Sequence, residues 1–223
     1  MQQHSTIAGT NKVARFEDLP KLIVRRQLNR SGNVLLAAME PLRDDEFFRG
    51  GPSGISCAWT LGHLACVADL FGAALDDGRL ALPPETHGVF NALDVGEQKS
   101  TSKAEGVDPE RYTKRHLFTM MRQTQVRLLK ILDVFDVQRW DAPAPDRVAD
   151  TLPTCGSMWE HLAVHTYWHL GELSSSVERF YGTYTMNSML HYFAWGENDT
   201  AAARRASEGH EPHPTLASNG AAT

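Results

Sequence analysis

Residues 156–182, GSMWEHLAVHTYWHLGELSSSVERFYG, decide the fold expected for this chain. Apolar side chains and histidines recur every three or four residues, which is the spacing of one face of an α-helix. The members of this face are Met158, Leu162, His165, His169, Leu173, Val177 and Phe180. Ser157 and Glu160 have the pattern of a capping box, and Gly182 suits a left-handed helix stop. The sequence therefore predicts one long amphipathic helix.

Three histidines, His161, His165 and His169, lie four residues apart in this helix. Side chains at that spacing lie on one face, about 6 Å apart along the axis. Two imidazoles placed in this way can hold one metal ion between them. One ion cannot easily reach three successive turns, and His165 and His169 lie in the apolar face. We therefore expect His161 to line the approach or to pack at the bundle end, and not to be a ligand.

Three further segments repeat the helical spacing of apolar residues. Their expected bounds are about 18–40, 57–76 and 108–135. Ser56 suits the cap of the second, and Asp108-Pro109-Glu110 is a strong start for the third. Four amphipathic segments without any persistent strand-like alternation predict an all-α fold, a four-helix bundle.

The connections define the expected domain organisation. Residues 44–55 read as a loop, and residues 77–107 form a long loop between the second and third long helices, with a helical turn near Val89–Leu93. Loops of that length often have a function. An aromatic and apolar stretch, Met186–Trp195, predicts a short C-terminal helix. The expected units are a flexible arm (1–16), the bundle domain (17–196) and a disordered tail (197–223).

Composition and charge exclude several classes of protein. The net charge is −5, and no run of Lys or Arg exceeds two residues, which argues against nucleic acid or an anionic membrane as a partner. The N-terminus does not resemble a signal peptide, and no apolar run approaches the roughly 20 residues that span a bilayer. Three cysteines, Cys57, Cys66 and Cys155, indicate no disulfide framework. A cytoplasmic location is expected.

The second segment places His63 in its own apolar face. A single histidine there is more often a hydrogen-bonded core residue than a ligand, but two more inward imidazoles strengthen the metal hypothesis, because burying them without partners is costly. Cys66 is expected to be a small buried residue, and Trp59, Tyr167 and Trp168 are expected to pack. A di-iron site is not expected, because these helices lack the Glu-x-x-His motifs that it needs.

Two motifs, LGHL at 61–64 and HTYWHLGEL at 165–173, together resemble the DinB-like family. The resemblance covers roughly residues 19–181 in helix order. It implies a four-helix metalloprotein in which His63, His165 and His169 are the metal ligands. Many relatives have an arginine directly after the last histidine, where this chain has Leu170, so a substrate contact made by that arginine in relatives would not carry over.

The resemblance also implies a function. Three imidazoles leave a divalent ion, which is zinc, nickel, iron or manganese, at least one open coordination position. Family members include metal-dependent thiol-S-transferases, so we expect a low-molecular-weight thiol or water to be activated toward a small electrophilic substrate. Glu172 is a candidate catalytic base, an imidazole partner or a solvent-facing acid. A non-catalytic, stress-related or dimerising bundle stays open as the alternative, and we expect a homodimer.

Overall fold

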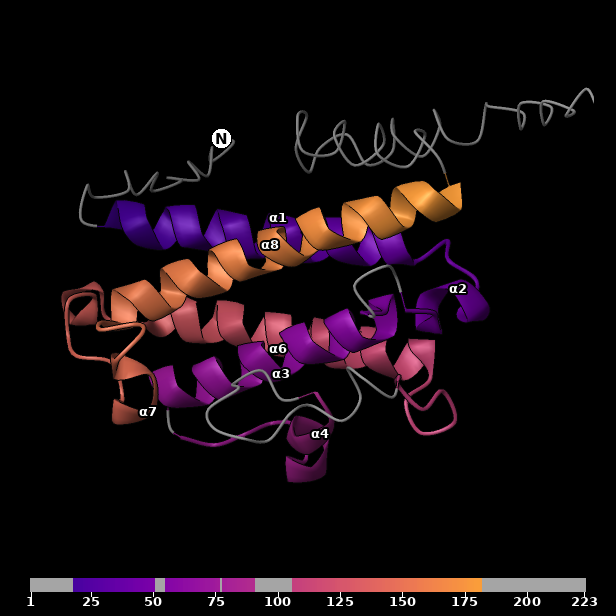
Figure 1. The fold of residues 1–223 in the computed structure, drawn as a ribbon. Coiled ribbons are helices and arrows are strands. Elements are labelled where there is room, and N and C mark those ends of the chain that lie inside the picture. Colours follow the sequence, from indigo (N-terminus) through magenta and orange to yellow (C-terminus); the bar gives the residue numbers. More distant parts are fainter. Residues whose placement is uncertain (1–17, 51–54, 77, 91–105, 182–223) are drawn as a thin grey trace, which may run out of the picture.

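The computed structural model describes residues 18–50, 55–76, 78–90 and 106–181, with only the backbone for 146–147 and 174–181. Four long helices form a bundle (Figure 1): α1 (Leu19–Met39), α3 (Cys57–Leu75), α6 (Lys114–Val134) and α8 (Cys155–Tyr181). The described residues contain no strand, only an isolated β-bridge. The predicted all-α four-helix bundle is confirmed. The predicted arm, the tail and the Met186–Trp195 helix lie outside the described residues.

The order of the helices in space could not be read from the sequence. Helices α1 and α8 run in one direction, and α3 and α6 run in the other (Figure 1). Lys21 near the start of α1 donates to the carbonyl oxygen of Asp133 at the end of α6, and Lys114 at the start of α6 donates to that of Glu40. Since α3 and α6 are parallel neighbours, the chain between them must cross the whole length of the bundle.

Short helices lie in the connections. A loop is predicted after α1, but α2 (Asp44–Phe48) forms there, and its Glu46 side chain accepts a hydrogen bond from the Arg43 amide. A helical turn is predicted near Val89–Leu93, but residues 91–93 lie outside the described residues; a short helix, α4 (Pro84–Val89), forms just before it. A 3₁₀ turn, η2 (Val137–Arg139), and α7 (Asp146–Ala149) connect α6 to α8.

The predicted start of α6 is wrong by more than one turn. The Asp108 side chain accepts a hydrogen bond from the Glu110 amide, so it closes a turn that precedes the helix. The helix begins at Lys114, where the Thr113 hydroxyl accepts from the His116 amide. A second capping residue downstream therefore takes the role that the sequence assigned to Asp108.

The predicted cap of α8 is also wrong. The Thr154 hydroxyl accepts from the Ser157 amide at 3.1 Å, and the Ser157 hydroxyl accepts from the Thr154 amide at 3.0 Å. This reciprocal pair is a capping box that starts three residues earlier than the predicted Ser157–Glu160 pair. The histidine spacing is unaffected, because the helical phase does not depend on where the helix begins.

The core confirms the predicted apolar faces. All seven members of the predicted α6 stripe are buried: Leu117, Met120, Met121, Thr124, Leu128, Ile131 and Phe135. Helix α3 is buried almost all round and not on one stripe alone. It is long and apolar enough to cross a membrane, so the prediction that no segment reaches that length is wrong. Its buried share of 89% identifies it as the central helix of the bundle.

One buried carboxylate, Asp69 on α3, holds the chain that follows α3. Its Oδ1 accepts from the Arg127 guanidinium at 2.6 Å and from the Ala81 amide at 2.8 Å. Its Oδ2 accepts from the Leu82 amide at 2.9 Å and from His87 Nε2 at 3.0 Å. Burial acts to raise the pKa of the Asp69 carboxyl, but the bonds from His87 and the two amides bring it below the ordinary 3.8.

A glycine of α3 lets this connecting segment approach closely. A Cβ added at Gly62 would lie 2.4 Å from the ring of Phe90, which is fully buried. The ring therefore occupies the space that any larger residue at position 62 would need. Gly62 precedes His63, so one turn of α3 carries a histidine on one face and, on another face, the glycine against which the Phe90 ring packs.

We expect Gly62→Ala to lower the free energy of unfolding by about 1–3 kcal/mol, because a well-packed ring must move. Urea denaturation measures the change. Gly171→Ala is the matched control, since nothing lies within 4 Å of its added Cβ, and alanine there should be neutral or stabilising. Equal destabilisation by both substitutions would contradict the close-packing explanation.

Candidate metal centre

Three histidines from two antiparallel helices converge at the centre of the bundle. His63 comes from α3, and His165 and His169 come from successive turns of α8. One ring nitrogen from each lies within 4.8 Å of the other two. The Nε2 atoms of His165 and His169 are 3.2 Å apart. The structure thus brings together the three residues that the sequence singled out, and His161 is not in this group.

The distances suit an ion shared by three imidazoles. Metal–nitrogen bonds of about 2.0–2.1 Å place two ligands of a tetrahedral ion roughly 3.3 Å apart. The separation of 3.2 Å between the two Nε2 atoms of α8 is close to that value. The limit of 4.8 Å for the whole group is wider than this separation, so the three nitrogens would have to draw closer together around an ion. The cluster can therefore hold a metal ion.

The surroundings of the three histidines favour the protonation state in which an imidazole can bind a metal ion. His63 and His169 are buried, and the Nδ1 atom of His165 is buried without a hydrogen-bond partner in the described part of the chain. Burial, with the nearby His169, His63 and His161, lowers the pKa of His165 to about 3. A neutral imidazole is the form that binds a metal ion. An ion held by the Nε2 atoms would not supply the partner that this Nδ1 lacks, so the case for a metal depends on the convergence of the three rings.

Aromatic contacts fix the rings. Trp59 is buried and stacks on His63, with ring centroids 4.5 Å apart and an interplanar angle of 21°. His161 stacks on His165 at 4.9 Å and 26°. Burial lowers the pKa of His161, so this neighbour also favours the neutral form. The expected packing role of Trp59 is therefore specific, because it holds one of the three converging rings.

Glu172, whose side chain is 42% exposed, hydrogen-bonds one of the three histidines. Its Oε2 accepts a hydrogen bond from His169 Nδ1 at 2.7 Å, and its Oε1 accepts from Trp168 Nε1 at 3.1 Å. This bond assigns the proton of His169 to Nδ1 and leaves the Nε2 lone pair facing the other histidines. Carboxylate–histidine pairs of this kind are common behind metal ligands.

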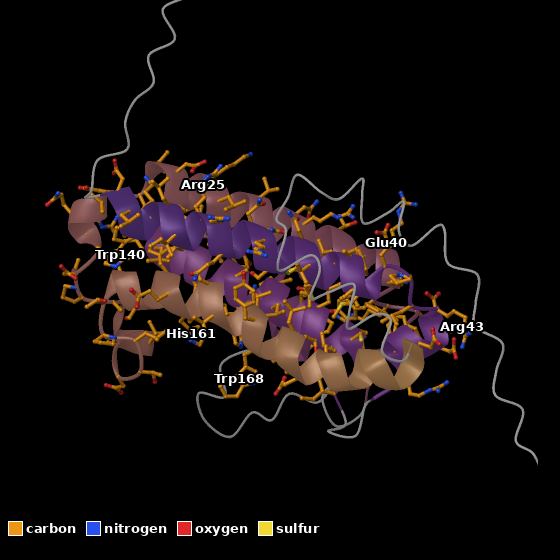
Figure 2. The ribbon with its side chains drawn as sticks, turned by 90° about the horizontal axis from the view of Figure 1, so that it is seen from above. Arg25, Glu40, Arg43, Trp140, His161 and Trp168 are labelled. Carbon is orange, nitrogen blue, oxygen red and sulfur yellow. The ribbon has the colours of Figure 1, made fainter. Side chains whose placement is uncertain are left out.

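The packing role predicted for Trp168 is wrong. The side chain is 67% exposed, and Figure 2 shows it projecting outward from α8. Its position four residues before Glu172 is the sequence signal for the contact, because side chains at that spacing meet on a helix. Sequence reasoning missed it because aromatic residues in amphipathic helices are usually assigned to the core.

The remaining residues considered from the sequence lie outside the cluster. Cys66 is buried, as predicted, and burial with the charge of Asp69 raises its pKa to about 12. Tyr167 is partly buried against the core, and burial raises its pKa. Leu170 is also buried in the core. In this chain, the position that holds an arginine in many relatives therefore faces the core and not an open site.

Comparisons with known proteins agree with this geometry. The family model described as the DinB superfamily matches residues 27–173, about two thirds of the chain. That span includes His63, His165, His169 and Glu172. No curated protein and no solved structure matches the chain. The family match and the four-helix architecture together establish that this chain belongs to the DinB superfamily.

Proposed function

We propose that this protein is a mononuclear metalloenzyme in which His63, His165 and His169 hold one divalent ion. The observation that carries the proposal is the convergence of three ring nitrogens within 4.8 Å. Sites with three protein ligands and an open position are typical of catalytic metal ions, whereas structural ions usually have four protein ligands. An all-imidazole set suits zinc, nickel or iron, and manganese less well.

The proposed chemistry is attack on a small electrophile by a low-molecular-weight thiol or by water. When bound, a divalent ion lowers the pKa of a coordinated thiol or water, so that the nucleophile exists at neutral pH. The residues of the chain orient this site. Glu172 holds the proton of His169 on Nδ1, and Trp59 fixes the plane of His63. Both oxygens of Glu172 already accept hydrogen bonds, which favours a positioning role for this residue over that of a base.

The proposal is tested with the purified full chain. Metal analysis should find about one divalent ion per chain, and thiol consumption with an aryl halide or hydrolysis of an activated ester should require it. An ion that supports neither reaction would reject the enzyme and leave a metal-binding bundle. A structural ion would show itself differently, because chelation would lower the melting temperature by many degrees.

Glu172→Gln is expected to weaken metal binding by about 10–100-fold, since a neutral amide orients the His169 ring less strongly than a carboxylate. Trp168→Phe removes one donor to the same carboxylate and should have a smaller effect in the same direction. Competition with a chromophoric chelator measures both affinities. Glu160→Gln is the control on the same helix, and it should bind as the wild type does. Unchanged affinity in Glu172→Gln would remove this residue from the site.

A further inference from the structure

A small cavity lies inside the bundle, and all four long helices, α1, α3, α6 and α8, contribute to its lining. Every lining residue except His165 is buried. The centre of a water-sized sphere can move through about 20 Å³ within the cavity. A cavity needs roughly 10–15 Å³ by this measure to hold one water molecule. The space therefore fits a single water and is too small for a substrate.

The lining of this cavity is apolar except for three residues, which are Gln125 of α6 and His165 and Thr166 of α8. Gln125 is 8% exposed and Thr166 is 6% exposed, so both polar side chains belong to the core. A purely apolar cavity stays empty, whereas a buried water needs two to four polar partners. The three polar residues can supply these partners.

One ring nitrogen of His165 needs such a partner. Its Nδ1 is buried and has no hydrogen-bond partner in the described part of the chain. Its Nε2 faces His169 Nε2 at 3.2 Å, so an ion in the proposed centre would lie on that side of the ring. Metal-binding histidines usually donate their other N–H to a carboxylate, a carbonyl oxygen or a water. His169 has Glu172 in this role at 2.7 Å, and the cavity offers the same to His165.

The side chain of Gln125 is held in a defined orientation. Its Nε2 donates to the carbonyl oxygens of Leu28 and Asn29, both at 3.3 Å. These bonds use both amide protons and leave Oε1 as an acceptor. Gly32 makes room for the amide, because a Cβ added there would lie 2.5 Å from Nε2 of Gln125. An amide oxygen inside a bundle needs a donor, which a water in the cavity can supply.

The partner of His165 Nδ1 must change its role when an ion binds. Glu172 holds the proton of His169 on Nδ1, so in the metal-free protein His169 Nε2 accepts from His165 Nε2. His165 Nδ1 then carries no proton and must accept a hydrogen bond. With an ion on both Nε2 atoms, the proton of His165 lies on Nδ1, which must donate. A water molecule can donate in the first state and accept in the second, whereas a carbonyl oxygen can only accept.

We propose that the cavity holds one water molecule bonded to His165 Nδ1, to Gln125 Oε1 and to the Thr166 hydroxyl, and that Gln125 is a positioning residue of the metal centre. The role of Gln125 rests on the proposed function, because it acts on the ion only through His165. The water donates to Nδ1 in the metal-free protein and accepts from it when the ion is bound. Gln125 accepts from the water in both states and so keeps it in place.

Nuclear magnetic resonance of the full chain tests for the water itself. Water-selective Overhauser spectra should show contacts between water and the methyl groups of Val67 and Leu162, which line the cavity, with and without zinc. Long-range proton–nitrogen spectra of protein labelled with ¹⁵N-histidine show which nitrogen of His165 carries the proton, and His165→Ala assigns the signal. We expect Nε2 without metal and Nδ1 with zinc.

Matched variants test the role of Gln125. Gln125→Met keeps a similar volume but removes the acceptor, so zinc binding should weaken about tenfold and the water contacts should fade. Thr166→Val removes a second partner of the water and should have a smaller effect in the same direction. Thr124→Val is the control, because the Thr124 hydroxyl is buried on the same helix as Gln125 but donates to the carbonyl oxygens of Met120 and Met121. It should bind zinc as the wild type does in competition with a chromophoric chelator.

The outcomes separate this proposal from the metal centre on which it rests. Zinc binding without any water contact at the cavity methyl groups would overturn the water and leave the centre intact. Equal zinc affinities in Gln125→Met and Thr124→Val would remove Gln125 from the centre. A wild-type chain that binds no zinc would reject the proposed function and the role of Gln125 with it, even if the water contacts are seen.

Discussion

Replacing His165 by alanine is expected to weaken the binding of a divalent ion by more than about a hundredfold and to leave the bundle folded. Loss of a ligand should exceed the 10–100-fold effects of residues that only support ligands. The ring of His165 contacts those of His169 and His63, with centroid distances of 4.7 and 5.3 Å, so its removal breaks both contacts. In the variant, His63 and His169 supply only two ring nitrogens, one fewer than the proposed site requires.

The fold should survive because the apolar core does not depend on this ring. Two clusters of buried apolar residues, one toward each end of the bundle, hold the helices together. Burial strongly disfavours the protonated form of His165, as its pKa of about 3 shows. The buried ring is therefore neutral at neutral pH, and alanine removes only its packing and its contacts with the other rings. Circular dichroism should therefore report unchanged helix content.

His161→Ala is the control for this prediction. It removes an imidazole from the same helix, one turn before His165. This imidazole stacks on the His165 ring, with the ring centroids 4.9 Å apart. A titration with cobalt or zinc should show near wild-type affinity for this variant and a large loss for His165→Ala. If both variants bind the ion with wild-type affinity, the proposed ligand set is wrong. If His161→Ala loses binding as severely, His161 is a ligand and the centre differs from the one proposed.

The metal centre could be predicted in outline because its signals are local. His165 and His169 are four residues apart, and helical geometry alone places them together. His63 is a different case, because it meets them only when α3 crosses α8 in the antiparallel sense, and loop lengths do not fix that arrangement. The sequence placed it there through the family resemblance. The bond between Glu172 and His169 was one of the roles predicted for Glu172, but the contact from Trp168 to Glu172 was missed, although its spacing is visible.

The long helices were predicted because each buries a stripe that repeats over many turns. The α6 stripe is the clearest case, since every predicted member is buried. Helix ends were predicted less well, because several nearby residues can cap: Thr113 takes the place of Asp108, and Thr154 that of Ser157. Helix α2 has only five residues, too few to show a period.

The buried carboxylate of α3 leads to the second large effect, on stability. Asp69→Ala is expected to lower the free energy of unfolding by about 3–5 kcal/mol, which corresponds to a fall in melting temperature of roughly 6–20 °C. The substitution leaves the partly buried Arg127 guanidinium without its carboxylate. It also leaves the amides of Ala81 and Leu82 without an acceptor. Unsatisfied buried groups cost more than the lost bonds themselves contribute.

Asp133→Ala is the matched control, because it also removes an aspartate paired with an arginine. The Asp133–Arg25 pair is about half exposed, and such pairs contribute about 0–1 kcal/mol. Urea unfolding of both variants gives the comparison. Similar small losses in the two would show that Asp69 does not organise the segment after α3. A second test is the pair Asp69→Leu with Arg127→Met, which should be less destabilising than Asp69→Ala because no charge remains buried.

The pH dependence gives Asp69 a signature that simple packing would not. The hydrogen bonds from His87 and the two amides outweigh burial and hold the pKa of the folded-state carboxyl below 3.8. The stability that this carboxylate contributes is therefore fully present above that value and is lost as the pH falls through the folded-state pKa. The difference in unfolding free energy between wild type and Asp69→Asn should be constant at neutral pH and shrink below pH 3.8. A difference that stays constant into acid would mean that the charge of Asp69 does not matter, and that only its shape holds the connecting segment in place.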